Sequence, residues 1–191
     1  FPGAAQHLPR CHARHVELVA PMVWGNAQAP VPASERSGLT LCIGGGTSPL
    51  VSWDHIRHPV ARVLTAVWQV CRQLRMPLSV IGSASLSEFA TRAPAQLKVL
   101  GSVSPARSSE LIGASRLLIT TPGIGATYEA IRASTPVLLL PPMNSTQLQQ
   151  FQVFRQHGIA HALAGSPLLD ELRGVEQMHW NRHARGCIDW T

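Results

Sequence analysis

Short apolar runs alternate with helix-like segments along residues 39–157, and this alternation constrains the fold more than any other feature of the chain. Strands alternating with helices form a parallel sheet, and right-handed crossovers make such a sheet doubly wound. We therefore expect an α/β fold with a Rossmann-like, doubly wound parallel sheet. The runs typical of strands are residues 39–43, 78–81, 97–100, 117–120 and 136–140.

Apolar residues at helical spacing mark the segments between these strands. Residues 59–74 show the pattern most strongly, and Pro59 suits the first turn of a helix. Further helices are predicted over residues 105–113, 123–133 and 145–157. Two more short strands are predicted, at residues 16–20 and 159–163.

The composition limits the class of protein. Hydrophobic residues make up 45% of the chain and charged residues 14%, which excludes a disordered chain. No apolar run approaches the roughly 18 residues of a membrane span, and the four cysteines form no CxxC pair, so we expect a cytoplasmic protein. The only lysine, Lys98, precedes Val99, so there is no P-loop. The sequence also lacks the GxSxG motif that is typical of serine hydrolases.

The proline-rich residues 1–38 are interpreted as a linker or N-terminal extension, residues 39–175 as one ligand-binding domain, and residues 176–191 as a polar tail. His179, His183 and Cys187 would share one helix face in this tail, but no fourth ligand is evident, which favours a solvated tail over a metal site. Since the chain begins with Phe1 instead of Met, we expect a piece of a longer protein. The net charge of +6 comes from scattered arginines, which favours one anionic ligand over nucleic acid.

Ligands on such sheets bind beyond the carboxyl ends of the strands, so the loops there carry the candidate residues. Gly44, Gly46 and Thr47 follow the first strand, but Pro49 stands where a dinucleotide fingerprint needs its third glycine. This loop is either a tight turn or a loop that binds a phosphate or an acceptor.

A second glycine pair joins the fourth strand to a helix. The amides of Gly123 and Gly125 at a helix start form an anion site, to which Thr127 can add a hydroxyl. Glu129, one turn further on, can accept two hydrogen bonds from a ribose diol. Helix packing by the glycines and a helix-dipole role for Glu129 are the alternatives.

Asn144 and Gln147 begin the next helix, directly after the rigid turn formed by Pro141 and Pro142. Their amide side chains can both donate to and accept from sugar hydroxyls. Helix capping is the alternative role for Asn144.

The stretch from Gly123 through Glu129, with Pro136, Pro141 and Gln147, resembles the donor-binding half of GT-B nucleotide-sugar glycosyltransferases. The peptidoglycan N-acetylglucosaminyl transferase and the UDP-glycosyltransferases carry this pattern, and the similarity covers residues 39–163. The run at residues 140–144 suggests the bacterial cytosylglucuronate synthase type, which acts in natural-product biosynthesis.

The resemblance implies a role for each matching residue. The assignments are Gly123, Gly125, Ala126 and Thr127 to the donor diphosphate, Glu129 to the ribose, Asn144 and Gln147 to the transferred sugar, Gly101, Ser102 and Val103 to the nucleobase, and Gly45, Gly46 and Thr47 to the cleft beside the phosphates. Thr121 replaces a histidine of many relatives, and Val103 lies near where they carry a tryptophan, which leaves the base undecided.

The resemblance also implies one half of a two-domain transferase that moves a sugar from a UDP-linked donor without a metal or other cofactor. The acceptor site, and usually the catalytic base, belong to the other half, so no catalytic residue is named. The alternatives are a subunit of a split two-chain transferase and a non-catalytic nucleotide-binding module. The expected partners are the nucleotide sugar and an acceptor-binding domain or chain. The sugar, the acceptor, the stereochemistry and homo-oligomer formation stay open.

Overall fold

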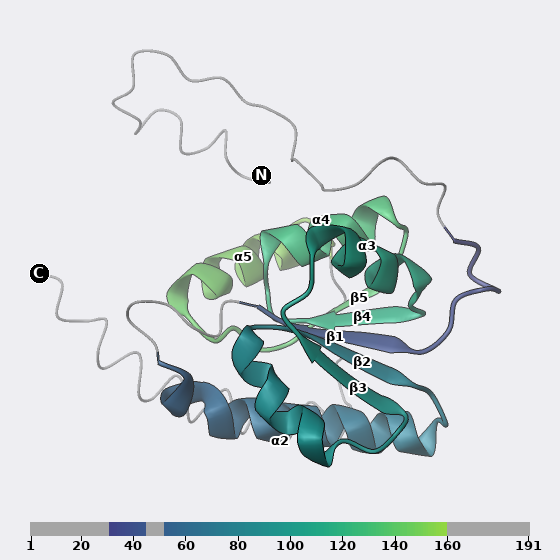
Figure 1. Cartoon of the computed structure of the whole chain (residues 1–191). Coiled ribbons are helices and arrows are strands. Elements are labelled where there is room, and N and C mark those ends of the chain that lie inside the picture. The colour runs from purple at the N-terminus through teal and green to yellow at the C-terminus, as the bar shows by residue number, and fades with distance from the viewer. Residues whose placement is uncertain (1–30, 45–51, 160–191) are drawn as a thin grey trace, which may run out of the picture.

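A computed structural model describes residues 31–44 and 52–159 of the chain. Within these residues, five parallel strands form one sheet in the order β3-β2-β1-β4-β5 (Figure 1). The strands are β1 (Leu39–Ile43), β2 (Leu78–Gly82), β3 (Leu97–Gly101), β4 (Leu117–Thr120) and β5 (Val137–Leu139). The structure confirms the predicted doubly wound parallel sheet, and each strand lies within one residue of its predicted bounds.

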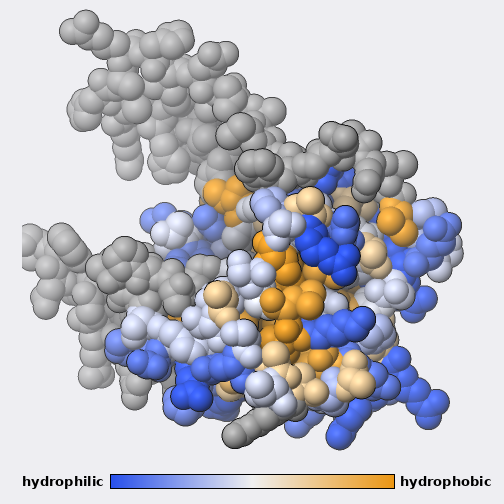
Figure 2. All heavy atoms as spheres, viewed as in Figure 1, coloured by the Kyte–Doolittle hydropathy of each residue, from blue (hydrophilic) through white to orange (hydrophobic). Residues whose placement is uncertain are grey.

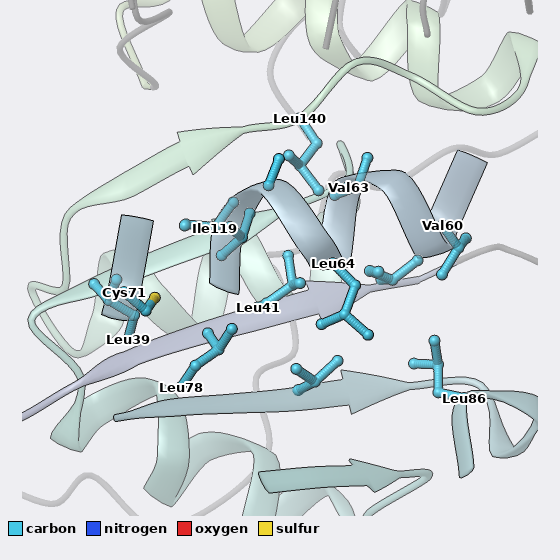
Figure 3. Packing of buried hydrophobic residues seen from close by; sticks show 14 of the residues in the cluster. Leu39, Leu41, Val60, Val63, Leu64, Cys71, Leu78, Leu86, Ile119 and Leu140 are labelled. Atoms are coloured by element: carbon cyan, nitrogen blue, oxygen red, sulfur yellow. The ribbon is translucent and has the colours of Figure 1, made fainter. Parts of the chain in front are cut away.

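The first face of the sheet is covered by α2 (Trp53–Gln73), which lies below the sheet in Figure 1. Alternate residues of the strands point toward this helix, and the close view in Figure 3 shows Leu41 and Ile119 of the sheet in one cluster with Val63 and Leu64 of α2. Burying each such aliphatic side chain contributes roughly 1.5–3 kcal/mol, so this layer is the main core of the described fold.

The opposite face is covered by α3 (Pro105–Ala114) and α4 (Ile124–Arg132). Ile112, Leu118 and Ala130 form a smaller core there, with Cys42 of β1 packed against it. Ser104 begins α3 by accepting a hydrogen bond from the Arg107 amide, with Pro105 in the first turn as the sequence suggests.

Helix α2 begins at Trp53, so the prediction that a helix starts at Pro59 is wrong. Pro59 lies inside the helix, where it lacks the N–H that would bond to the carbonyl of His55. Burial of Ile56 and Val60 on either side of it offsets this loss by holding both turns against the sheet.

A 3-10 helix, η2 (Ala84–Arg92), connects β2 to β3 and was not predicted. Leu86 anchors it in the core, and Glu88 accepts hydrogen bonds from Trp53 Nε1 (3.1 Å) and Arg57 Nε (2.8 Å) at the start of α2. Helix η2 is therefore stabilised by contacts with a distant segment and by local turns. It does not depend on an apolar repeat of 3.6 residues, which is the pattern that predicts a helix.

Helix α5 (Ser145–Gln156) follows β5 and buries Phe154 completely. The bounds of α3, α4 and α5 agree with the predicted helices to within one residue at each end. The strand predicted at residues 16–20 lies outside the described residues. Of the predicted strand at residues 159–163, only Ile159 is described, and it follows α5 outside any strand.

Residues 31–38 precede β1 and hold one buried arginine. Arg36 is 6% exposed and donates to the carbonyls of Ser134 (2.7 Å) and Ala133 (2.8 Å) just beyond α4, and to the carbonyl of Val31 (2.8 Å). Because the carbonyls of Ala133 and Ser134 follow the last turn of α4, the guanidinium satisfies acceptors that have no helical donor.

Two glycines are required by the backbone where β1 meets its neighbours. Gly82 has φ +153°, and a Cβ there would lie 2.2 Å from the carbonyl oxygen of Ile43. Gly38 has φ +68°, and its Cβ would lie 2.7 Å from the carbonyl oxygen of Pro77. No side chain larger than hydrogen fits at either position without moving the backbone.

The edge of the sheet at β3 is only partly covered. Figure 2 shows an apolar strip that runs down the middle of this face of the molecule. On β3 itself, Leu97 and Val99 belong to the core on the α2 face, whereas the alternate residues Lys98 and Leu100 are exposed, Leu100 by 40%. None of the helices in residues 31–44 and 52–159 is long and apolar enough to span a membrane.

Candidate functional site

The strand order of the sheet reverses between β1 and β4: β2 and β3 follow on one side of β1, and β4 and β5 on the other. Strand β1 pairs with β2 on one side and β4 on the other, and the connections after β1 and β4 pass to opposite faces. Loops that diverge in this way leave a crevice at the carboxyl ends of the two strands, where doubly wound sheets bind ligands. Gly44 and Thr121, which directly follow these strands, hydrogen bond to each other there.

Helix α4 begins at this point without a side-chain cap. Its N-cap residue is Gly123, whereas Ser104 caps α3 and Asn144 caps α5 through their side chains. The Thr127 amide donates to the Gly123 carbonyl (3.3 Å) at the start of α4, so the amides of Ile124, Gly125 and Ala126 precede any helical acceptor. They point out of the positive end of the helix dipole, which favours an anion.

Gly125 has an unobstructed position on this helix start. A Cβ built on it meets nothing within 4 Å among the described residues, and the residue is exposed. An anionic group can therefore approach its amide closely.

Thr127 lies on the buried side of the same turn. Its side chain is 0% exposed, and its Oγ1 has no hydrogen-bond partner within the described part of the chain. Contact between this hydroxyl and a diphosphate stays a prediction, and the amides of the exposed residues Ile124 and Gly125 are the more accessible donors.

Glu129 is 7% exposed and lies between α4 and α3. Ser108 Oγ of α3 donates to Glu129 Oε2 at 3.1 Å. Burial raises the pKa of Glu129 above its usual range, while hydrogen bonds from Ser108 and Ser109 and the charge of Arg132 act in the opposite direction. The two serines therefore favour the ionised carboxylate in a position that otherwise disfavours it.

Cys42, near the end of β1, is electrostatically coupled to Glu129. The pKa of Cys42 is raised to about 11, chiefly by burial; a hydrogen bond with Thr120 acts in the opposite direction, and the charge of Glu129 adds a smaller upward effect. The thiol is consequently protonated at neutral pH and is not a nucleophile.

Asn144 and Gln147 have hydrogen-bond partners within the protein. Asn144 Oδ1 accepts from the Gln147 amide (2.9 Å), which is the capping role left open from the sequence. Gln147 is 5% exposed; its Oε1 accepts from the Met143 amide (2.7 Å) and its Nε2 donates to the Gly44 carbonyl (2.8 Å). The sugar contacts predicted for both residues stay predictions.

The residues predicted to face the nucleobase lie at the end of β3 and directly after it, at the same carboxyl edge. Gly101 is buried with φ +63°, Ser102 is exposed and Val103 is half-buried. The predicted cleft residues Gly45, Gly46 and Thr47 lie outside the described residues, as do His179, His183 and Cys187.

Sequence reasoning did not identify Ser108 as a residue of the site, and it noted Thr121 only as a departure from relatives. Ser108 lies in a predicted helix and Thr121 directly follows a predicted strand, so the topology could have pointed to both. Among the described residues, no cluster of three or more His, Cys, Asp or Glu side chains could hold a metal ion. Whether ligand binding needs a metal stays a prediction.

No family model and no curated protein matches the chain. Among solved structures, the spinosyn rhamnosyltransferase SpnG, complexed with spinosyn aglycone, aligns with a TM-score of 0.56 and 17% identity over 87% of this chain and 43% of that one. The UDP co-structure of S. aureus MnaA aligns with a TM-score of 0.50 and 13% identity, over 82% and 38%. The chain thus spans less than half the length of either protein.

These likenesses show that the chain has the Rossmann-like fold present in part of a glycosyltransferase and of a protein solved with UDP. The fold and the uncapped helix start at the sheet reversal together define a domain suited to binding an anionic ligand. The closer resemblance to cytosylglucuronate synthase stays a prediction.

Proposed function

We propose that this chain is the donor-binding half of a nucleotide-sugar glycosyltransferase and that it binds UDP or a UDP-linked sugar without a metal. The observation that carries the proposal is the uncapped start of α4 at Gly123, located where the sheet reverses between β1 and β4. The fold shared with a rhamnosyltransferase and with a protein solved with UDP supports it.

The diphosphate would lie against the amides of Ile124, Gly125 and Ala126. Backbone N–H groups and the helix dipole can neutralise a diphosphate leaving group in place of a metal ion. Thr127 would add its hydroxyl once a ligand gives that buried oxygen a partner, because a buried polar atom without one is costly.

The nucleoside would extend from α4 toward β3. Glu129 would accept the ribose hydroxyls, and the backbone of Gly101, Ser102 and Val103 would meet the base. Strands β4 and β3 are separated by three steps in the sheet order, roughly 14 Å at about 4.8 Å per step, which is about the length of an extended nucleoside diphosphate.

The acceptor site and the catalytic base would come from a second domain or a separate chain. A non-catalytic nucleotide-binding module is the competing function, and the described residues provide the same anion site for it. Transfer activity that appears only with an acceptor-binding half would favour the transferase.

Calorimetric titration of the chain with UDP, in the presence and absence of EDTA, tests the proposal. We expect binding with the same affinity in both buffers and no binding of uridine, which lacks the diphosphate. Absence of UDP binding would reject the donor-binding function, and loss of binding under EDTA would reject its metal independence.

A further inference from the structure

Three segments far apart in the sequence meet at Gly44, the first residue after β1. Thr121 Oγ1 accepts from the Gly44 amide (3.0 Å) and donates to the Gly44 carbonyl (3.1 Å), and Gln147 Nε2 donates to that carbonyl (2.8 Å). We call Gly44, Thr121 and Gln147 the Gly44 clamp. It joins the ends of β1 and β4 to the first turn of α5.

The amide of Gln147 is oriented by two partners of opposite kind. The Met143 N–H requires an acceptor, which is Oε1, and the Gly44 carbonyl requires a donor, which is Nε2. Gln147 is 5% and Thr121 2% exposed, so these bonds are shielded from water. Turning the amide toward a ligand would break its bonds to the half-buried Met143 N–H and Gly44 carbonyl.

The clamp acts directly on the turn that leads into α4. Thr121 is separated from Gly123, the N-cap of α4, by Pro122 alone, and Pro122 is buried. Holding Thr121 against Gly44 therefore determines where the amides of Ile124, Gly125 and Ala126 point. Gln147 extends this constraint to α5, because it donates to the same carbonyl.

We propose that Gln147 and Thr121 are positioning residues, which hold the start of α4 in the geometry that binds the diphosphate. This inference rests on the proposed function. It differs from a sugar contact by Gln147 in what it predicts for ligands: a misplaced anion site weakens every ligand with a diphosphate, whereas a lost sugar contact weakens only the nucleotide sugar.

Two nearly isosteric variants remove one side of the clamp each, Gln147→Met and Thr121→Val. In both, we expect the affinities for UDP and for UDP-glucose to fall by the same factor, about tenfold. Gln149→Met, on an exposed position of α5, is the matched control and should bind as the unmodified chain does. Unchanged UDP affinity in Gln147→Met would overturn the inference, while leaving the donor-binding function intact.

Amide hydrogen exchange at residues 123–126 gives a readout that needs no ligand. Faster exchange there in both variants is expected if the clamp holds the turn, and unchanged exchange would overturn the inference even if the chain failed to bind UDP. Thr121→Ser keeps the hydroxyl, so it should restore both exchange and affinity if Thr121→Val folds poorly.

Gln147→Glu adds a pH readout. At neutral pH its carboxylate would face the Gly44 carbonyl with no proton to donate, whereas a protonated carboxyl donates to Gly44 and still accepts from Met143. We therefore expect the UDP affinity of this variant, relative to the unmodified chain, to recover as the pH falls. A ratio that does not change with pH would contradict the role of the Gln147–Gly44 bond.

Discussion

Ser108 of α3 donates its hydroxyl hydrogen to Glu129 Oε2 of α4 at 3.1 Å, across the contact between the two helices. This bond keeps a buried carboxyl nearer to ionisation, since burial alone raises its pKa. The ribose hydroxyls need that ionised carboxylate as their acceptor in the proposed complex.

Ser108→Ala should raise the pKa of Glu129 further and move the acidic limit of UDP binding to higher pH. The effect should be larger for UDP than for 2′-deoxy-UDP, which offers one ribose hydroxyl fewer to the carboxylate. Calorimetry with both nucleotides from pH 5 to 8 measures this, with the exposed Ser87→Ala as the control. Equal pH profiles for Ser108→Ala and the unmodified chain would show that the serine has no such influence.

Glu129→Gln should separate stability from binding. Because the folded-state pKa of Glu129 lies above its usual value, the folded chain binds a proton more tightly than the unfolded chain. The free energy of unfolding therefore decreases as pH rises from the usual pKa of the carboxyl through the raised one, and is constant above it. The variant lacks this decrease, so its stability relative to the unmodified chain should increase over that window.

At neutral pH, Glu129→Gln should be at least as stable as the unmodified chain and should bind UDP about tenfold to a few hundredfold more weakly, because a charged acceptor is lost. Urea unfolding from pH 4 to 8 and UDP titration measure the two effects. Unchanged UDP affinity would leave Glu129 as a purely structural carboxyl.

Gly125→Asp should strengthen the helix while weakening ligand binding. Gly125 lies in the first turn of α4, where a negative charge stabilises the helix by about 0.3–1 kcal/mol, and its Cβ has open space. The same charge would repel a diphosphate at the neighbouring amides. Gly125→Asn, similar in size and neutral, is the matched control in thermal melts and UDP titrations. Equal UDP affinities of the two variants would locate the diphosphate elsewhere.

Arg36→Met should destabilise the fold by about 2–4 kcal/mol without a large change in UDP affinity. It leaves the carbonyls of Ala133 and Ser134 without their guanidinium donor, at the end of α4 opposite the anion site. Urea unfolding measures the loss, and Arg62→Met on the exposed face of α2 is the control. A loss no larger than that of the control would show that water satisfies these carbonyls equally well.

The strands could be predicted because they are short apolar runs, four of which end directly before glycine or proline, and the start of α4 because its glycines follow such a run. The start of α2 was misplaced because a proline is favoured in a first turn, and only tertiary burial of Ile56 and Val60 outweighs that preference. Helix η2 was missed because its sequence shows no helical spacing of apolar residues. Its position depends on hydrogen bonds from α2 to Glu88, which no local pattern reveals.

The Gly44 clamp could not be predicted from local patterns. Gly44 is separated from Thr121 by 77 positions and from Gln147 by 103, so only the strand order brings them together. The sugar contacts of Asn144 and Gln147 are predicted from the hydrogen-bonding capacity of their amides. In the folded chain, these amides bond to other groups of the protein. A side chain suited to a sugar hydroxyl is equally suited to a backbone carbonyl.

The close approaches of Gly82 to Ile43 and of Gly38 to Pro77 give a test of kinship. A Cβ at these positions would overlap the carbonyl oxygens of Ile43 and Pro77, so a homologue cannot vary there while it keeps the same strand spacing. Distant chains that align here can be sorted by these two positions alone. Those with glycine at both can retain this sheet in detail, and those with any other residue must have rebuilt the junction between β1 and β2.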